Sequence, residues 1–162
     1  MVIWLNGTVG VGKSTVGQAL AAVLPGAAYV DGDDYAGPSH LPHALRWRVA
    51  LDVLLRLVAR TGRTRVLVVA YPLRGPDHAR LRAACGRARR VLTVVTLAPP
   101  LTTTLCGRGG RELDVGESAR VRKMRSEGYH CRRFAAFTLP NTQPPPGRTA
   151  RLIARRLRSS PE

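Results

Sequence analysis

The chain has 162 residues, 44% of them hydrophobic, which is enough for one domain with a proper core and too few for two ordinary domains. The formal net charge of +16 suggests a nucleic-acid partner, but aromatic residues make up only 5% and no RNA-binding signature is present. We therefore interpret the charge mainly as arginines on solvated faces, with a few recruited for phosphate binding, and expect no nucleic-acid partner.

Targeting and redox signals are sparse as well. The N-terminus enters a short apolar run, residues 2–5, with no basic leader, and no stretch is long enough to cross a bilayer. Cys85, Cys106 and Cys131 are odd in number and widely spaced, so we interpret them as reduced thiols. These features predict a cytoplasmic protein without a membrane partner, either a monomer or a homodimer.

Short β-branched runs alternate with longer helical patterns along the chain, which predicts βαβ units and a parallel sheet. The predicted strands are residues 2–6, 27–30, 66–70, 91–97 and 134–139. The predicted helices are residues 13–24, 42–60, 76–85, 101–106, 117–127 and 149–158. The helix at 42–60 is expected to bury Leu45, Val49, Val53, Leu54, Leu57 and Val58. No repeat or linker divides the chain, so we expect a single domain over residues 1–162.

Residues 7–14 match the pattern G-x-x-x-x-G-K-[ST] without a mismatch, between an apolar strand and a helix, as a P-loop requires. The loop consists of Gly7, Thr8, Val9, Gly10, Val11, Gly12, Lys13 and Ser14. Its glycines allow backbone N–H groups to point at phosphate oxygens, and the positive end of the following helix adds to that field. Lys13 is expected to reach the β and γ phosphates of ATP or GTP. Ser14 should offer its hydroxyl to Mg²⁺, and Thr15 should help near the α phosphate.

The position of the carboxylates selects among P-loop proteins. The N-K-x-D motif of a GTPase switch is absent, and the strand at 66–70 runs into Tyr-Pro-Leu, where a motor or transport ATPase normally has an acid. The acids follow the second strand instead, at Asp31, Asp33 and Asp34, which suits a small-molecule kinase. Asp33 is the candidate general base for the acceptor hydroxyl, the alternative being a helix cap or turn former. Asp31 either supports Mg²⁺ through water or has a structural role.

Two segments resemble known kinases. Residues 2–7, Val-Ile-Trp-Leu-Asn-Gly running into the phosphate loop, resemble the start of tunicamycin-resistance proteins, in a group with chloramphenicol phosphotransferase, gluconate kinase and shikimate kinase. Residues 29–33, Tyr-Val-Asp-Gly-Asp, resemble the strand-two aspartate motif of gluconate and adenylylsulfate kinases. In chloramphenicol phosphotransferase the matching aspartate is the base, and it falls on Asp33. The resemblance is dense over about the first 35 residues and architectural afterwards.

The resemblance also implies the fold and a lid. We expect a three-layer α/β P-loop kinase domain whose five-stranded parallel sheet has the order 2-3-1-4-5, with a lid at about residues 108–125. Arg108 and Arg111 match the basic lid-entry segment of these kinases, where arginines grip the nucleotide. Arg120, Arg122 and Arg125 follow on the lid helix, and one or two of them should contact phosphate.

The acceptor pocket is expected from Tyr35, Arg46, Trp47 and Tyr71 together with Asp33, since Trp47 and Tyr71 could stack on a ring and Arg46 could bind a polar group. For Trp47 the alternative is core packing. The predicted reaction is Mg²⁺-dependent transfer of the γ-phosphoryl group to a hydroxyl of a small molecule. The resemblance suggests a nucleoside antibiotic of the tunicamycin or capuramycin kind. The alternatives are a metabolic kinase for a sugar acid, nucleoside or nucleotide, and a nucleotide-dependent regulatory module with no acceptor.

Overall fold

The computed structural model describes residues 1–62, 65–107, 113–142 and 145–159. Five strands form one parallel sheet in the order β2-β3-β1-β4-β5, which confirms the predicted order. The strands are β1 (Val2–Asn6), β2 (Ala28–Asp31), β3 (Leu67–Ala70), β4 (Leu92–Leu97) and β5 (Phe137–Leu139). β1 is the central strand, and its Val2 lies opposite Leu67 of β3 on one side and Leu92 of β4 on the other.

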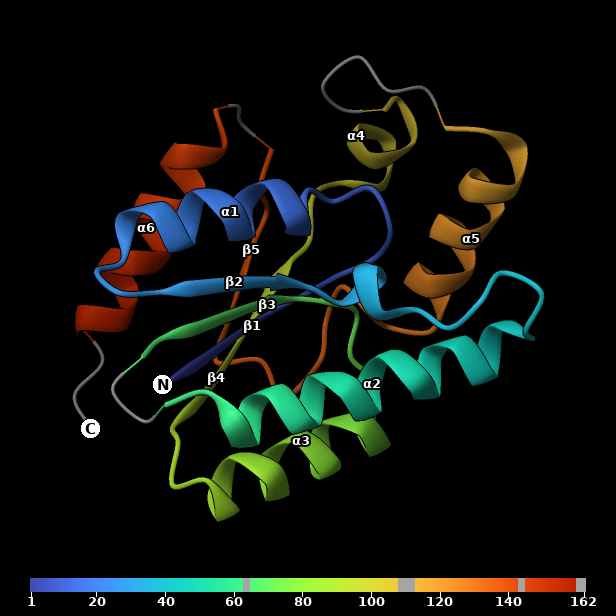
Figure 1. Ribbon diagram of the computed structural model, residues 1–162. Helices are drawn as coiled ribbons and strands as arrows, with labels where there is room; N and C mark the ends of the chain where they lie inside the picture. The colour runs from blue at the N-terminus through green and yellow to red at the C-terminus, as the bar shows by residue number, and fades with distance from the viewer. Residues whose placement is uncertain (63–64, 108–112, 143–144, 160–162) are drawn as a thin grey trace.

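Helices cover both faces of the sheet, so the domain has three layers (Figure 1). The helices on one face are α1 (Lys13–Val23) and α6 (Pro146–Ser159), and those on the other are α2 (His43–Arg60) and α3 (Gly75–Arg87). Val2 and Trp4 of β1 belong to the core under α2 and α3, whereas Ile3 and Leu5 belong to the core under α1 and α6. Because successive side chains of a strand point to opposite faces, a central strand covered on both sides is apolar throughout.

The remaining described elements lie at the carboxyl end of the strands. α4 (Leu101–Leu105) and α5 (Val115–Ser126) lie beyond this end of the sheet, and the short 3-10 helix η1 (Gly32–Tyr35) directly follows β2 there (Figure 1). Ligands of open α/β sheets bind outside the carboxyl ends of the strands. This edge is therefore where the fold leaves room for a site.

α2 buries Leu54 and Val58 as predicted, but the rest of its buried set differs from the predicted one. Leu45 and Val49 are 44% and 40% exposed, while the buried residues are Trp47, Ala50, Leu51, Leu54 and Val58. The buried set follows the i, i+3, i+4, i+7 spacing of one helical face, and it places the largest side chain, Trp47, against the sheet. The predicted set mixed this face with the flanking one.

The ends of two other elements also differ from the prediction. α5 begins two residues earlier because the Asp114 carboxylate accepts from the Glu117 N–H (2.7 Å) and the Glu117 side chain accepts from the Asp114 N–H (3.4 Å). This capping box satisfies N–H groups that a helix start leaves free. β5 is shorter than residues 134–139 because the chain turns at Ala135, whose N–H donates to the carbonyl of Arg132 (3.1 Å).

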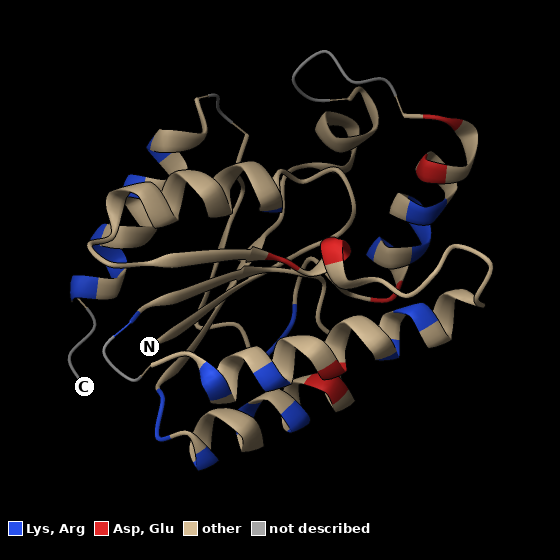
Figure 2. Ribbon diagram, in the orientation of Figure 1, with Lys and Arg blue, Asp and Glu red and all other residues tan. Residues whose placement is uncertain are grey.

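Charge is distributed unevenly over this framework. Lys and Arg occur on helices of both faces of the sheet and on α5, whereas the fewer acidic residues occur at η1, around α5, and on α2 and α3 (Figure 2). The wide spread of arginines agrees with the interpretation that most of them lie on solvated surface. None of the described helices combines the length and the hydrophobicity that spanning a bilayer requires.

Candidate active site

The loop between β1 and α1 has the conformation of a phosphate cradle. Gly7, Gly10 and Gly12 have φ angles of 144°, 76° and 85°, in the positive-φ region that residues other than glycine rarely adopt. At Gly7 the space is closed as well, because a Cβ there would lie 2.5 Å from the carbonyl oxygen of Leu97 on β4. Gly12 is the N-cap of α1, so the loop delivers its N–H groups to the positive end of that helix.

A buried asparagine, distant from this loop in the sequence, holds the loop in place. The Nδ2 of Asn141, in the segment after β5, donates to the carbonyl of Val11 (2.7 Å), and its Oδ1 accepts from the hydroxyl of Thr149 on α6 (2.8 Å). Asn141 is buried and has φ 36°, a left-handed conformation that asparagine tolerates better than most residues. Sequence reasoning missed this role of Asn141 in holding the cradle.

Lys13 lies at the start of α1 with its ammonium turned back on the loop. Its Nζ donates to the carbonyl of Thr8 (2.7 Å). Burial lowers the pKa of Lys13 to about 8, against the opposite effect of the Asp33 and Asp31 carboxylates, and Arg120 lowers it further. A lysine held in this way can turn to an incoming phosphate without first losing a strong ion pair.

A cavity of about 500 Å³ opens in front of the cradle. Gly10, Gly12, Lys13, Ser14 and Thr15 form its cradle side. The opposite sides come from four other segments, which contribute Asp33 and Ala36 after β2, Arg46 and Trp47 of α2, Pro72 after β3, and Thr104, Gly107, Leu113, Glu117 and Arg120 around α4 and α5. The predicted cradle residues and the predicted base therefore share one cavity.

Two aspartates of the acidic segment after β2, Asp31 and Asp33, have different surroundings. The Asp31 carboxylate caps η1, because its Oδ1 accepts from the Asp33 N–H (3.1 Å). Its other oxygen, Oδ2, accepts from the Tyr29 hydroxyl (2.9 Å). Gly32 is buried, and a Cβ there would overlap the ring of Tyr71. The cap that the sequence allowed for Asp33 is thus made by Asp31, and the Asp33 side chain is left to line the cavity.

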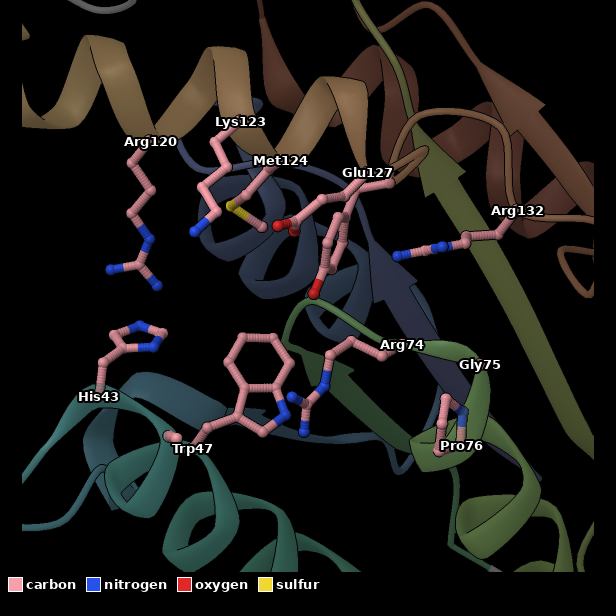
Figure 3. A pocket seen from close by; sticks show the side chains of 12 residues that line it. His43, Trp47, Arg74, Gly75, Pro76, Arg120, Lys123, Met124, Glu127 and Arg132 are labelled. Carbon is pink, nitrogen blue, oxygen red and sulfur yellow. The ribbon is translucent and has the colours of Figure 1, made fainter.

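A second cavity of about 650 Å³ adjoins the first, and Trp47 and Arg120 line both (Figure 3). Its lining comes from the start of α2 (His43, Ala44, Trp47), the start of α3 (Arg74, Gly75, Pro76), one face of α5 (Arg120, Lys123, Met124, Glu127), and Tyr129 and Arg132 after α5. The α5 residues recur at helical spacing, with Met124 largely buried, so this face of the helix covers the cavity.

A buried carboxylate holds the floor of the second cavity. Asp77, on the first turn of α3, accepts from Trp47 Nε1 (3.0 Å) and from Arg74 Nε (2.6 Å), and it is only 4% exposed. The Arg74 guanidinium lies 4.8 Å from the centre of the Trp47 ring. Tyr71 supports Trp47 from below, with ring centroids 4.8 Å apart. Trp47 is therefore fixed by three neighbours, and the 6% of it that stays exposed contributes to the lining of both cavities.

The predicted acceptor residues occupy different depths around these cavities. Trp47 lines both, and Arg46 lines the cradle cavity while its Nε donates to the Gly37 carbonyl (3.0 Å). Tyr71 is 4% exposed between Gly32 and Trp47, and Tyr35 packs half-buried against the core. Neither tyrosine is among the described residues that line the two cavities, so their contact with an acceptor stays a prediction.

The lid arginines separate in the same way. Arg108 and Arg111 lie outside the described residues. Arg120 lines both cavities, whereas Arg122 is exposed and Arg125 donates to the carbonyl of Pro99 (3.2 Å). Helical spacing places Arg120, Lys123 and Glu127 on one face of α5, but the sequence does not reveal which face turns inward.

Sequence reasoning missed the cavity residues Arg74 and Arg132, and also a third, buried residue that lines neither cavity. Arg74 and Arg132 stand alone in unrelated segments, and no local pattern marks them. Asn6, at the end of β1, is the third: its buried amide donates to Thr96 Oγ1 (3.0 Å) and to the Tyr129 carbonyl (3.1 Å), and its Oδ1 accepts from the Leu73 N–H (2.9 Å). It thereby ties together the segments that carry Arg74 and Arg132.

Comparison with known proteins gives structural matches without sequence matches. No protein-family model matches the chain, and no curated protein matches it. Among solved structures, a shikimate kinase from Acinetobacter baumannii in complex with shikimate has a TM-score of 0.69 at 24% identity, covering 98% of this chain and 93% of that one. A gluconokinase from Sinorhizobium meliloti 1021 has a TM-score of 0.68 at 21% identity, covering 98% and 97%.

A third match is the Deinococcus radiodurans tunicamycin resistance protein, with a TM-score of 0.62 at 22% identity, covering 96% of this chain and 94% of that one. The chain has the fold of the P-loop kinases. The expected resemblance to the tunicamycin-resistance, gluconate kinase and shikimate kinase group is thereby confirmed at the level of structure. At these identities the match concerns the fold, and the reaction has to be argued from the site.

Proposed function

We propose that the protein is a Mg²⁺-dependent kinase that transfers the γ-phosphoryl group of ATP or GTP to a hydroxyl of a small molecule. One observation carries this proposal: a phosphate cradle with its lysine, Lys13, and an uncommitted carboxylate, Asp33, line the same cavity. The glycine conformations fit a triphosphate, because φ angles of 76° to 144° at Gly7, Gly10 and Gly12 allow successive backbone N–H groups to turn toward one anion. A cavity built only to hold a nucleotide would not need the carboxylate.

In the proposed reaction the cradle and Lys13 bind the triphosphate, and Asp33 orients the acceptor hydroxyl and takes its proton as the new O–P bond forms. The bond between the γ phosphorus and the bridging oxygen breaks, and the nucleoside diphosphate leaves with the electron pair. Lys13 and Arg120 stabilise the charge on the transferring group, with Arg108 and Arg111 proposed to join them in a lid over about residues 108–125.

Ser14 lines the cradle cavity and is the residue proposed to hold Mg²⁺, whose charge would neutralise the phosphate oxygens. Mg²⁺ usually keeps several waters and the substrate phosphates as ligands, so one protein hydroxyl is sufficient for this fit. Both oxygens of the second proposed ligand, Asp31, already accept hydrogen bonds from the chain. Asp31 is therefore proposed to act on the metal through water rather than directly.

Asp33→Asn tests the reaction. Removing the base should lower turnover by about two to four decades, while calorimetry should find nucleotide binding retained. Asp34→Asn is the matched control, because Asp34 is the exposed neighbour and is not among the described residues lining the cavity. Equal turnover in Asp33→Asn and in the unchanged protein would remove Asp33 from the mechanism.

For the acceptor we propose a nucleoside antibiotic as the first candidate, because a tunicamycin resistance protein is among the structural matches. Phosphorylation would add charge and bulk that spoil binding of the drug to its target. Growth of a susceptible host on a panel of such antibiotics, with and without the gene, tests this, and mass spectrometry should find a product heavier by one phosphate. Protection against none of them would reject this acceptor class and leave the reaction open.

The second candidate is a metabolic acceptor such as a sugar acid or a nucleotide, and the basic lining of the second cavity favours it. A regulatory module without an acceptor would behave differently from both. It would hydrolyse nucleotide at a rate that no acceptor changes, whereas a kinase should consume nucleotide faster when its acceptor is added.

A further inference from the structure

The second cavity contains more positive charge than its neighbours in the chain neutralise. The described residues that line it include four cations, Arg74, Arg120, Lys123 and Arg132, and one acid, Glu127. Arg74 is paired with Asp77. Among the described residues, Lys123, Arg120 and Arg132 form no ion pair with a carboxylate, and their side chains line one cavity together with Trp47. Such a concentration of unpaired cations in a concave site favours an anionic ligand.

Lys123 and Arg132 define where that ligand would lie. The Lys123 ammonium extends from α5 toward the cavity on one side of Glu127, and the Arg132 guanidinium extends toward it from the segment after α5 on the other (Figure 3). The two cations thus approach one space from different elements. Arg120 lies farther along α5, toward His43 and the cradle cavity (Figure 3).

Arg132 shows a second, independent sign of a missing partner. Its guanidinium lies 4.3 Å from the centre of the Tyr129 ring, a stacking contact that fixes the plane of the group. Its Nε is buried, and no described residue accepts a hydrogen bond from it. Buried N–H groups nearly always have an acceptor, and a planar guanidinium is best matched by the paired oxygens of a carboxylate or a phosphate.

We propose that Lys123 and Arg132 bind a carboxylate or phosphate group of the acceptor, so that the substrate of this enzyme is a hydroxylated small-molecule anion. The inference rests on the proposed function, because the same acceptor has to present a hydroxyl to Asp33, and it favours the second acceptor candidate, a sugar acid or nucleotide, over a neutral nucleoside antibiotic. Trp47 and Arg120 line both cavities, so the cavities adjoin and one acceptor can span from Asp33 to the two cations. A neutral acceptor leaves the two cations without a counter-charge and binds more weakly.

The binding test uses inorganic phosphate and acetate as probes, on protein whose cradle is saturated with magnesium and a non-hydrolysable ATP analogue. The two indole N–H groups report in a nitrogen–proton NMR spectrum: Trp47 donates to Asp77 at the cavity, and Trp4 donates to the Tyr71 carbonyl in the core. Trp47→Phe assigns the signals. A probe bound at the cavity should shift the Trp47 signal saturably and leave that of Trp4 in place.

Lys123→Gln and Arg132→Gln should each weaken the probe at least tenfold. Arg133→Gln, which removes the same charge from the exposed neighbour, should leave its affinity unchanged. Phosphate binding without acetate binding identifies a phosphomonoester acceptor, and the reverse identifies a carboxylic acid. The inference is overturned if neither probe shifts the Trp47 signal, or if Arg133→Gln weakens binding as much as the other two. Repeating the titration in Lys13→Ala keeps the result independent of nucleotide binding.

Turnover distinguishes this inference from the proposed function. Pairs of acceptors that differ by one anionic group, such as a sugar acid and its sugar or a nucleotide and its nucleoside, should favour the anion in kcat/KM at least tenfold. Arg132→Gln should shrink that preference chiefly through KM. Phosphorylation of neutral and anionic members alike would sink the inference and leave the kinase intact. Anion binding without phosphorylation of any acceptor would count against the kinase alone.

Discussion

Asp77 provides a direct test of how the acceptor wall is held together. Its carboxylate is 4% exposed and accepts from the Trp47 indole (3.0 Å) and from the Arg74 guanidinium (2.6 and 3.3 Å). Asp77→Ala removes both contacts at once. Because the indole lies in the core and the guanidinium reaches solvent, the two losses should differ greatly in size.

The magnitude follows from the exposure of each partner. Leaving the buried Trp47 N–H without an acceptor should cost about 1–3 kcal/mol. The Arg74 side chain is 44% exposed, so water can solvate it, and its pairing should add no more than about 1 kcal/mol. Asp77→Ala should therefore lower the free energy of unfolding by about 1–4 kcal/mol, as the sum of these two effects. Asp77→Asn, which keeps an oxygen for the indole, should lose about 1 kcal/mol, the share of the charged pair.

The chain contains a matched control for this substitution. Arg80 and Asp52 form an ion pair of the same length, 2.6 Å, but their side chains are 48% and 46% exposed. Asp52→Ala should therefore change the stability by less than about 1 kcal/mol. Urea unfolding of the three variants measures the differences, and the Trp47 indole signal should broaden or move in Asp77→Ala alone. Equal midpoints for Asp77→Ala and Asp52→Ala would refute the argument that burial decides the value of the contact.

Two further predictions concern the cradle. Gly7→Ala should abolish nucleotide binding in calorimetry, because a Cβ there would lie 2.5 Å from the Leu97 carbonyl at a φ of 144°; retained affinity would show that the loop relaxes freely. The pKa of Lys13 is lowered from 10.5 to about 8, so nucleotide affinity should fall as the pH rises through 8, and Lys13→Met should lose that step. The unfolded chain binds more protons than the folded one between these values, so Lys13 should make the free protein more stable as the pH rises from about 8 to 10.5. A free energy of unfolding that does not change with pH between about 8 and 10.5 would contradict the lowered pKa of Lys13.

The fold and the cradle could be predicted because their signals are local. Five apolar strands alternating with helical patterns define a parallel sheet, and eight consecutive residues define the P-loop. The acidic segment could be predicted only in part. Three carboxylates lie within four residues, and which of them faces the cavity depends on Gly32 fitting under Tyr71, a contact between segments far apart in the chain.

The acceptor cavity could not be predicted for the same reason on a larger scale. Its lining comes from α2, the start of α3, α5 and the segment after α5, and the single arginines of the last three segments meet only in the folded chain. Arg74 and Arg132 have no pattern that distinguishes them from the other arginines of a very basic sequence. What distinguishes them is the partner that each has or lacks, Asp77 in one case and none described for the Nε of Arg132 in the other.

Two basic residues of α5 differ in the cavities that they line, so their effects on nucleotide binding and on anion binding can be measured separately. Arg120 lines both cavities, whereas Lys123, one turn later, lines only the second. Arg120→Gln should therefore weaken both the ATP analogue and the phosphate probe, while Lys123→Gln should weaken the probe and leave the analogue within about twofold, since charge screening limits its reach to the cradle. Calorimetry with the analogue and the Trp47 signal with phosphate report the two affinities independently. Lys123→Gln could instead weaken the analogue as much as Arg120→Gln does. The two cavities would then act as a single anion site, and the assignment of nucleotide to one cavity and acceptor anion to the other would be wrong.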